Sequence, residues 1–248
     1  MCRLLGLVSA EPEPLPAQLG SDLSEFTKLS DHHCDGWGIA YWDGADDLVC
    51  HKAPEPARRS ADFEARTAAA TSDAALLHLR KASANMANNL DNTHPFVAGS
   101  VAFAHNGYLN PVSELDRLVT EVGGRDSTGD TDSERYFNLV LAQLRRHGPA
   151  EALHIAAELI ADRTEAMSLN CLLLTHDALF ASCRYDEKVV RAMGSDPRTF
   201  ELRYRADADR VVVASEGWAQ PEPWRMLHNG QILQVDRSDL RATVHTLR

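Results

Sequence analysis

The chain has 248 residues, with 44% hydrophobic and 25% charged residues and a formal net charge of −11. This length suffices for a substantial core in one large or two small domains, and the composition is that of a soluble globular protein. The acidic balance disfavours nucleic acid and anionic membrane surfaces as partners. No apolar run approaches the roughly 20 residues of a membrane-spanning helix, and no signal-peptide pattern precedes Cys2.

The five cysteines form no CxxC pair, and their odd number fits no closed set of disulfides. Reduced thiols and a cytoplasmic location follow as expectations.

The first part of the sequence predicts a strand, a helix and a loop in that order. An apolar run predicts a buried strand over residues 2–9, which Glu11-Pro12-Glu13-Pro14 is expected to end. Leucine and phenylalanine spacing predicts a helix over residues 15–30. Residues 31–38 read as a polar loop that contains glycine and leads into the next strand.

The rest of the chain mixes strand and helix patterns without a repeat or a linker. Later strands are expected at residues 48–52, 74–80, 100–105, 169–175, 179–185, 200–204, 211–215 and 231–235. Helices are expected at residues 60–70, 112–122, 131–147 and 149–163. These elements predict one α+β domain over residues 1–248, with residue 1 removed in the mature protein.

Cys2 follows the initiator methionine directly. Because cysteine is small, removal of Met1 is expected, and it would leave Cys2 with a thiol and a free α-amine. A free α-amine titrates near about 7.7–8.0, so it can accept the proton of a neighbouring thiol close to neutral pH. The alternative is that Cys2 is simply a small apolar residue that opens a core strand.

Three other short segments place polar residues or glycine at the ends of predicted elements. Arg80 ends one strand, Asn106-Gly107 ends another, and Asp132 opens a helix. Each has a structural alternative: a surface arginine, a plain turn, and a helix N-cap in which Thr131 and Glu134 have capping-box spacing. Likewise, His94 precedes Pro95 and could belong to a rigid turn.

Taken together behind an N-terminal cysteine, these segments resemble one family. The chain is similar to the class II glutamine amidotransferases of the N-terminal-nucleophile hydrolase superfamily, and most similar to their small stand-alone glutaminase-type members. The motifs that carry the resemblance are Met1-Cys2-Arg3-Leu4-Leu5-Gly6, Asp35-Gly36-Trp37-Gly38-Ile39-Ala40, the HxRxAS run at residues 78–83, Asn92-Thr93-His94-Pro95-Phe96, His105-Asn106-Gly107-Tyr108-Leu109 and Thr131-Asp132-Ser133-Glu134.

The resemblance implies a four-layer αββα sandwich of two antiparallel sheets and a site without metal or organic cofactor. It implies that Cys2 attacks a γ-glutamyl amide, that Asn106 and Gly107 stabilise the oxyanion, and that Arg80 and Asp132 bind the substrate's α-carboxylate and α-ammonium groups. On weaker grounds, the resemblance also places four residues at the substrate site: Ser83 and His94 in the pocket lining, and Trp37 and Gly38 in a covering loop.

The run Arg80-Lys81-Ala82-Ser83-Ala84 departs from the Arg-Trp-Ala-Thr-His of relatives of the glucosamine-synthase type. This smaller wall, and the chain's end at Arg248 without a synthase domain, favour hydrolysis of a γ-glutamyl amide with a leaving group larger than ammonia. Specificity for that group is expected from the wall and from the loop between Gly217 and Trp224. The alternatives are a glutaminase subunit that supplies ammonia to a separate synthase, and an inactive regulatory domain.

Two other site classes are disfavoured. His32 and His33 are adjacent in Asp31-His32-His33-Cys34-Asp35 and would point apart on a strand, so this cluster does not predict a metal site. The sequence contains no GxSxG, so a serine hydrolase of that type is not supported.

Overall fold

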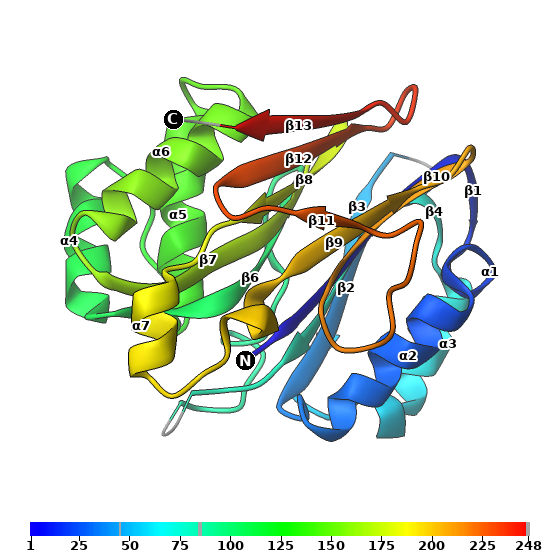
Figure 1. The fold of residues 1–248 in the computed structure, drawn as a ribbon, viewed down its shortest axis with the longest axis horizontal. Helices are drawn as coiled ribbons and strands as arrows, with labels where there is room; N and C mark the ends of the chain where they lie inside the picture. The colour runs from blue at the N-terminus through cyan, green and yellow to red at the C-terminus, as the bar shows by residue number, and fades with distance from the viewer. Residues whose placement is uncertain (45, 84–85, 247–248) are drawn as a thin grey trace.

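The computed structural model describes residues 1–44, 46–83 and 86–246 (Figure 1). Two antiparallel sheets lie face to face. The first sheet has the strand order β11 (Arg225–Leu227), β9 (Leu202–Ala206), β10 (Arg210–Ser215), β1 (Arg3–Pro14), β4 (Thr71–Arg80), β2 (Gly36–Trp42) and β3 (Leu48–Ala53). The second has the order β13 (Ala242–Thr246), β12 (Gln231–Asp236), β8 (Ala178–Cys183), β7 (Glu165–Leu174), β6 (Val101–Asn110) and β5 (Phe96–Ala98).

Helices cover the outer face of each sheet. The first sheet packs against α1 (Leu15–Leu19), α2 (Ser21–Lys28) and α3 (Ala61–Ala69), and the second against α4 (Val112–Glu121), α5 (Asp132–Leu144) and α6 (Pro149–Ala161). A shorter helix, α7 (Glu187–Ala192), follows β8, and 3-10 turns occupy Leu29–Asp31, Ala57–Arg59 and Pro197–Phe200. The predicted α+β, four-layer αββα architecture is confirmed.

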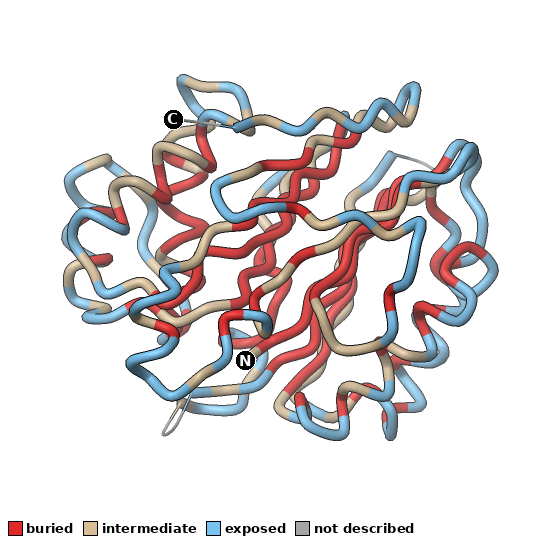
Figure 2. The backbone as a smooth tube through the Cα atoms, viewed as in Figure 1, coloured by how far each residue is buried: buried red, intermediate tan, exposed pale blue. Residues whose placement is uncertain are grey.

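Residues 3–9 of the central strand β1 are buried, and their side chains alternate between two cores (Figure 2). Leu4 and Val8 lie in the core between the sheets, whereas Leu5 and Leu7 face the helices. Gly6 lies on the inner face, where a Cβ atom would come within 2.7 Å of Leu179 of the facing sheet. Glycine therefore lets the two sheets approach closely at this point.

Two boundaries of the first segments were predicted wrongly. Strand β1 continues through Pro14, because pairing with β4 resumes at Glu13 after a register shift that begins at Val8. The predicted helix over residues 15–30 is divided into α1 and α2 at Gly20, whose φ of 51° breaks the helical backbone.

Two further segments predicted as loop or turn lie inside strands. Residues 36–38 belong to β2, and Asn106 and Gly107 lie within β6, paired with Asn170 and Leu169 of β7. The strands β5, β11 and β13 and the helix α7, which are short or lie at an edge, were not anticipated from the sequence. No helix in the described part of the chain is long and apolar enough to cross a membrane.

Candidate active site

Cys2 lies at the start of β1 and is 8% exposed. The Lys81 amide donates a hydrogen bond to the Cys2 Sγ atom at 3.4 Å, and the thiol donates to the Lys81 carbonyl oxygen at 3.7 Å. Burial raises the pKa of the Cys2 thiol; the amino terminus, the Lys81 amide and Arg80 act in the opposite direction. A thiol in this setting needs a nearby base to become a nucleophile.

The backbone around Cys2 is held by side chains on both sides. Arg3 donates from Nη1 to the Cys2 carbonyl oxygen at 3.0 Å and lies 3.7 Å from the Glu216 carboxylate. The Leu4 amide donates to the Ser215 hydroxyl of β10 at 3.0 Å. These contacts of Arg3 were not predicted from the sequence, although its position next to Cys2 was a usable signal.

Arg80 ends β4 beside Cys2 and is 2% exposed. Its guanidinium donates to the Asn88 side-chain oxygen at 2.8 Å and to the Ala87 carbonyl oxygen at 3.2 Å, both neutral groups. Within the described ranges, no carboxylate forms an ion pair with Arg80. Burial lowers the pKa of Arg80, so this cation lies in a setting that an anionic ligand would stabilise.

Asp132 is the first residue of α5 and is 8% exposed. Its Oδ2 atom accepts from the Leu109 amide of β6 at 2.7 Å, and its Oδ1 atom accepts from the Ser133 amide at 2.9 Å. The N-cap is Thr131, whose hydroxyl accepts from the Glu134 amide at 3.1 Å. Thr131, and not Asp132, is therefore the residue that caps α5. Asp132 instead joins α5 to β6 just beyond Gly107.

Asn106 lies within β6, fully buried. Neither the nitrogen nor the oxygen of its side-chain amide has a hydrogen-bond partner among the described residues. A Cβ atom on the neighbouring Gly107 would lie 1.9 Å from the Ser168 carbonyl oxygen, so the backbone packs here as glycine alone allows. A buried polar side chain without a partner is costly, and such groups are concentrated at functional sites.

The strand that carries Asn106 is held in place by hydrogen bonds on its other face. His105 lies 2.9 Å from the Ser168 carbonyl oxygen through Nε2 and 2.9 Å from the Ser133 hydroxyl through Nδ1. Because a carbonyl can only accept, Nε2 carries the proton and Nδ1 accepts from Ser133. The Ser168 hydroxyl in turn donates to the Asn106 carbonyl oxygen at 3.0 Å.

His94 packs in the interior next to a second histidine. Its ring lies 4.2 Å from the ring of His78 on β4 and 4.6 Å from that of Phe96. All four nitrogens of the two histidine rings lack a hydrogen-bond partner in the described structure. Burial lowers the pKa of His78 to about 3 and holds that of His94 well below its usual value, so both rings are neutral.

The remaining predicted site residues, Trp37, Gly38 and Ser83, lie in β2 and in the loop after β4. Trp37 lies in β2 and packs edge-on against Phe63 in the core beneath the helices, so the expected covering loop is wrong for this residue. Gly38 is also in β2, where a Cβ atom would lie 2.1 Å from the His94 carbonyl oxygen. Ser83 is exposed in the loop after β4, and the neighbouring Ala84 lies outside the described residues.

The late loop does not bring its tryptophans to Cys2. Trp218 packs against Phe26 and donates from Nε1 to the Asp22 carboxylate at 3.2 Å, and Trp224 packs against Trp218. Both are partly buried and pack against the core beneath the helices of the first sheet. The expected role of this loop in specificity for the leaving group stays a prediction.

No group of three or more histidine, cysteine, aspartate or glutamate side chains suited to a metal ion occurs among the described residues. The described cysteines, Cys2 included, are all free thiols, as expected from the sequence.

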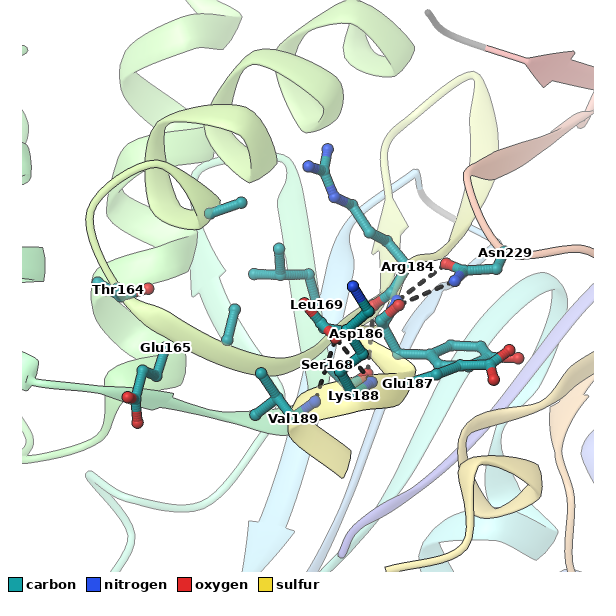
Figure 3. A pocket seen from close by; sticks show the side chains of 13 residues that line it. Thr164, Glu165, Ser168, Leu169, Arg184, Asp186, Glu187, Lys188, Val189 and Asn229 are labelled. Atoms are coloured by element: carbon teal, nitrogen blue, oxygen red, sulfur yellow. Dashed lines mark hydrogen bonds between the residues drawn. The ribbon is translucent and has the colours of Figure 1, made fainter. Parts of the chain in front are cut away.

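Met1 packs beside the site in an apolar cluster. We call the residues Met1, Tyr108, Met167, Tyr185, Val189, Val190 and Phe200 the Met1 cluster. A cavity of about 550 Å³ adjoins this cluster between the end of α6, β7 and α7 (Figure 3). Tyr185 and Val189 belong to both, so cavity and cluster are continuous.

Two antiparallel sheets between helical layers, with a cysteine directly before the central strand β1 of the first sheet, define a four-layer αββα protein. The family model described as "Glutamine amidotransferases class-II" matches residues 1–248. The chain belongs to this family, and it is an enzyme of the glutamine amidotransferase type that acts on a small-molecule substrate.

Comparisons with individual proteins agree with this assignment. The chain is 25% identical over 252 residues to the γ-glutamyl-hercynylcysteine sulfoxide hydrolase of Mycobacterium tuberculosis, covering 98% of this chain and 96% of that protein. A class II glutamine aminotransferase domain protein from Silicibacter pomeroyi has a similar structure, with a TM-score of 0.69, 20% identity and 99% coverage of both chains. The glutamine phosphoribosylpyrophosphate amidotransferase of B. subtilis matches with a TM-score of 0.67 and 18% identity, and the match covers 98% of this chain and 49% of that one.

Proposed function

We propose that this enzyme hydrolyses γ-glutamyl amides through a γ-glutamyl thioester on Cys2, after removal of Met1, and that its preferred leaving group is larger than ammonia. The observation that carries the proposal is the buried amide of Asn106, which has no partner in the described structure and lies next to Gly107. Support also comes from the relative named as a γ-glutamyl hydrolase, which this chain matches over nearly its whole length.

The first half-reaction forms the thioester. The Cys2 sulfur attacks the γ-carbonyl carbon while the free α-amine of Cys2 takes the thiol proton. The oxyanion accepts hydrogen bonds from the Asn106 side-chain amide and the Gly107 backbone amide, and each such donor is worth about 3–4 kcal/mol. The α-ammonium group then protonates the leaving nitrogen, the C–N bond breaks, and the amine departs.

The second half-reaction releases glutamate. Water attacks the thioester carbon with the α-amine as base, the same two donors stabilise the second tetrahedral intermediate, and the C–S bond breaks. Throughout, Arg80 binds the α-carboxylate by exchanging its neutral acceptors Asn88 and Ala87 for an anion, which makes stronger hydrogen bonds. Asp132 binds the α-ammonium group, since its two oxygens have lone pairs beyond the two hydrogen bonds that they accept from the Leu109 and Ser133 backbone amides.

The test is a comparison of kcat/KM for glutamine and for a panel of γ-glutamyl peptides and N-substituted glutamines, with enzyme whose loss of Met1 is verified by mass spectrometry. The proposal predicts that a substituted amide is the better substrate and that Cys2→Ala is inactive on all of them. Glutamine better by tenfold or more, or activity that appears only with a second protein, would instead identify an ammonia donor for a separate synthase.

A further inference from the structure

The Met1 cluster lies on the side of Cys2 where a leaving group must be. In the proposed reaction the α-amine of Cys2 protonates the leaving nitrogen, so the two nitrogens come within hydrogen-bond distance, about 3 Å. The chain of Met1 is attached to this same nitrogen of Cys2. A leaving group therefore extends from the region that Met1 occupies, and the Met1 side chain marks the surface that it would contact.

We propose that removal of Met1 leaves a space lined by the other residues of the Met1 cluster, and that this space is the subsite for the leaving group. The subsite takes an amine with an apolar or aromatic body. This inference rests on the proposed function and adds the location and the chemistry of its specificity. Without Met1, the members of the cluster are two tyrosines, two valines, a phenylalanine and a methionine, all uncharged. Burial of apolar surface against such a wall favours an apolar group at about 25 cal/mol per Å².

Phe200, which forms part of the wall of this subsite, is held by a hydrogen bond to β7, the strand paired with the one that carries Asn106. Asn170 lies opposite Asn106 in the β6–β7 pair, and its side-chain nitrogen donates to the Phe200 carbonyl oxygen. The Phe200 ring stacks on that of Tyr185, with centroids 6.0 Å apart and planes 24° apart. A shift of Phe200 would therefore be coupled to the strand that holds Asn106.

The segment around Tyr185 and α7 is fixed as well. Asn229 bonds the Tyr185 backbone reciprocally, accepting from its amide at 3.0 Å and donating to its carbonyl oxygen at 2.8 Å (Figure 3). Asp186 caps α7 by accepting from the Lys188 and Val189 amides. The wall thus has a defined shape, and the adjoining 550 Å³ cavity leaves room for groups that extend past Val189.

The experiment compares two N-substituted glutamines that differ in apolar bulk, N5-benzyl-L-glutamine and N5-methyl-L-glutamine, in kcat/KM with the processed enzyme. The wild type is expected to prefer the benzyl amide. Phe200→Ala is expected to lower the benzyl-to-methyl ratio by about tenfold or more, the range for loss of apolar contacts in a specificity pocket. Trp224→Ala, an aromatic truncation at a partly buried position against the core beneath the other helices, is the control and keeps the wild-type ratio.

Because Phe200 is fully buried, Val189→Asp provides a second variant at a partly exposed position. It puts a charge into the apolar wall and is expected to lower the same ratio. A wild-type preference for the methyl amide, or an unchanged ratio in a folded Phe200 or Val189 variant, would overturn the subsite while leaving the proposed hydrolysis intact. Failure of the processed wild type to cleave either amide or glutamine would overturn the proposed function and the subsite together.

Discussion

The two ends of the β-sandwich differ in how their polar side chains are partnered. At the end away from Cys2, Arg237 of the second sheet binds Asp73 of the first through Nη2 at 2.7 Å and Nε at 3.2 Å, and its guanidinium stacks over Trp42 at 5.5 Å. His176 adds a hydrogen bond to Asp177 at 2.8 Å. We call this set the closed end, because its charges are paired and several of these contacts join the sheets.

At the Cys2 end the same strands present groups without such partners. β4 begins near Asp73 and ends at Arg80, which has only neutral acceptors among the described residues. Asn106, His78 and His94 are buried there with side-chain polar atoms that lack partners in the described structure. At the closed end the polar side chains are paired with one another in the folded chain. At the Cys2 end several polar side chains lack such partners among the described residues, as expected where a bound substrate supplies them.

The largest expected effect is on catalysis by Asn106. Asn106→Ala is expected to lower kcat by about 10²–10³-fold, the range for loss of one oxyanion donor. The free energy of unfolding should change little from lost hydrogen bonding, since the side-chain amide forms no hydrogen bond in the described structure. Steady-state kinetics and urea unfolding measure the two effects. A fall in kcat of less than tenfold would remove Asn106 from the oxyanion site.

The second effect separates Asp132 from its neighbour Thr131. Asp132→Asn is expected to raise KM for γ-glutamyl substrates by roughly 10- to 100-fold, because a hydrogen bond to a charged group contributes about 1.5–3 kcal/mol. Thr131→Ala removes the N-cap and should cost about 1 kcal/mol of unfolding free energy without a comparable rise in KM. Normal substrate binding by a folded Asp132→Asn enzyme would contradict the proposed head-group site.

The third effect is on stability at the closed end. Arg237→Ala is expected to lower the free energy of unfolding by about 1.5–3 kcal/mol, since it leaves the Asp73 carboxylate without its partner. For a chain of this size, each kcal/mol corresponds to a fall in Tm of about 2–4 °C. Arg66→Ala, which breaks the exposed pair with Asp62, is the control and should cost less than about 1 kcal/mol. Arg237→Ala should not change kcat/KM, and a kinetic defect there would contradict the division between the two ends.

The last effect is a difference in pH dependence between the two ends. The pKa of His78 is lowered to about 3 in the folded protein. As the pH drops from about 6.5 towards 3, His78 therefore binds a proton in the unfolded chain but not in the folded one, and the free energy of unfolding falls. The slope is about 1.4 kcal/mol per pH unit for a histidine of this kind. The pKa of His176 is raised by its hydrogen bonds to Asp177 and Asp46, so its contribution is present at low pH and is lost as pH rises through the folded pKa.

Urea unfolding between pH 5 and pH 8 tests this contrast. His78→Phe should make the acid-side loss of stability shallower, and His176→Gln should destabilise at the low end of the range more than at the high end. Identical pH slopes for the wild type and His78→Phe would show that burial of the His78 ring does not carry this cost.

The ordered motifs were enough to predict the family and the four layers, which are confirmed, whereas the strand and helix patterns by themselves predicted only a mixed α+β domain. The roles of the site residues stay predictions. The paired strands, the position of Cys2 directly before β1 and the position of Arg80 at the end of β4 follow from apolar runs that end in polar residues. The burial of Arg80 does not follow, because a surface arginine at a strand end fits the same pattern. The local pattern was misleading at Asn106-Gly107, which has turn chemistry but lies inside β6 because pairing with β7 holds both residues extended. Tertiary pairing overrode local propensity there.

Features that depend on long-range packing could not be read from the sequence. Trp37 was expected in a covering loop, yet alternation along β2 directs it towards Phe63 on the helix side. The Met1 cluster joins the first residue of the chain to residues as far along it as Phe200, and no sequence spacing connects them. Helix α7 has only six residues, which is too short for a clear helical period.

The central claim, that Cys2 carries the reaction through a thioester, is tested most directly by trapping the intermediate. Processed enzyme is mixed with a good γ-glutamyl amide, quenched in acid during turnover and digested, and the peptides are measured by mass spectrometry. The account predicts a mass increase of one γ-glutamyl group on the peptide that begins with Cys2, and a larger trapped fraction for substrates that acylate fast. A γ-glutamyl group on another residue, or on another of the five cysteines, would contradict it.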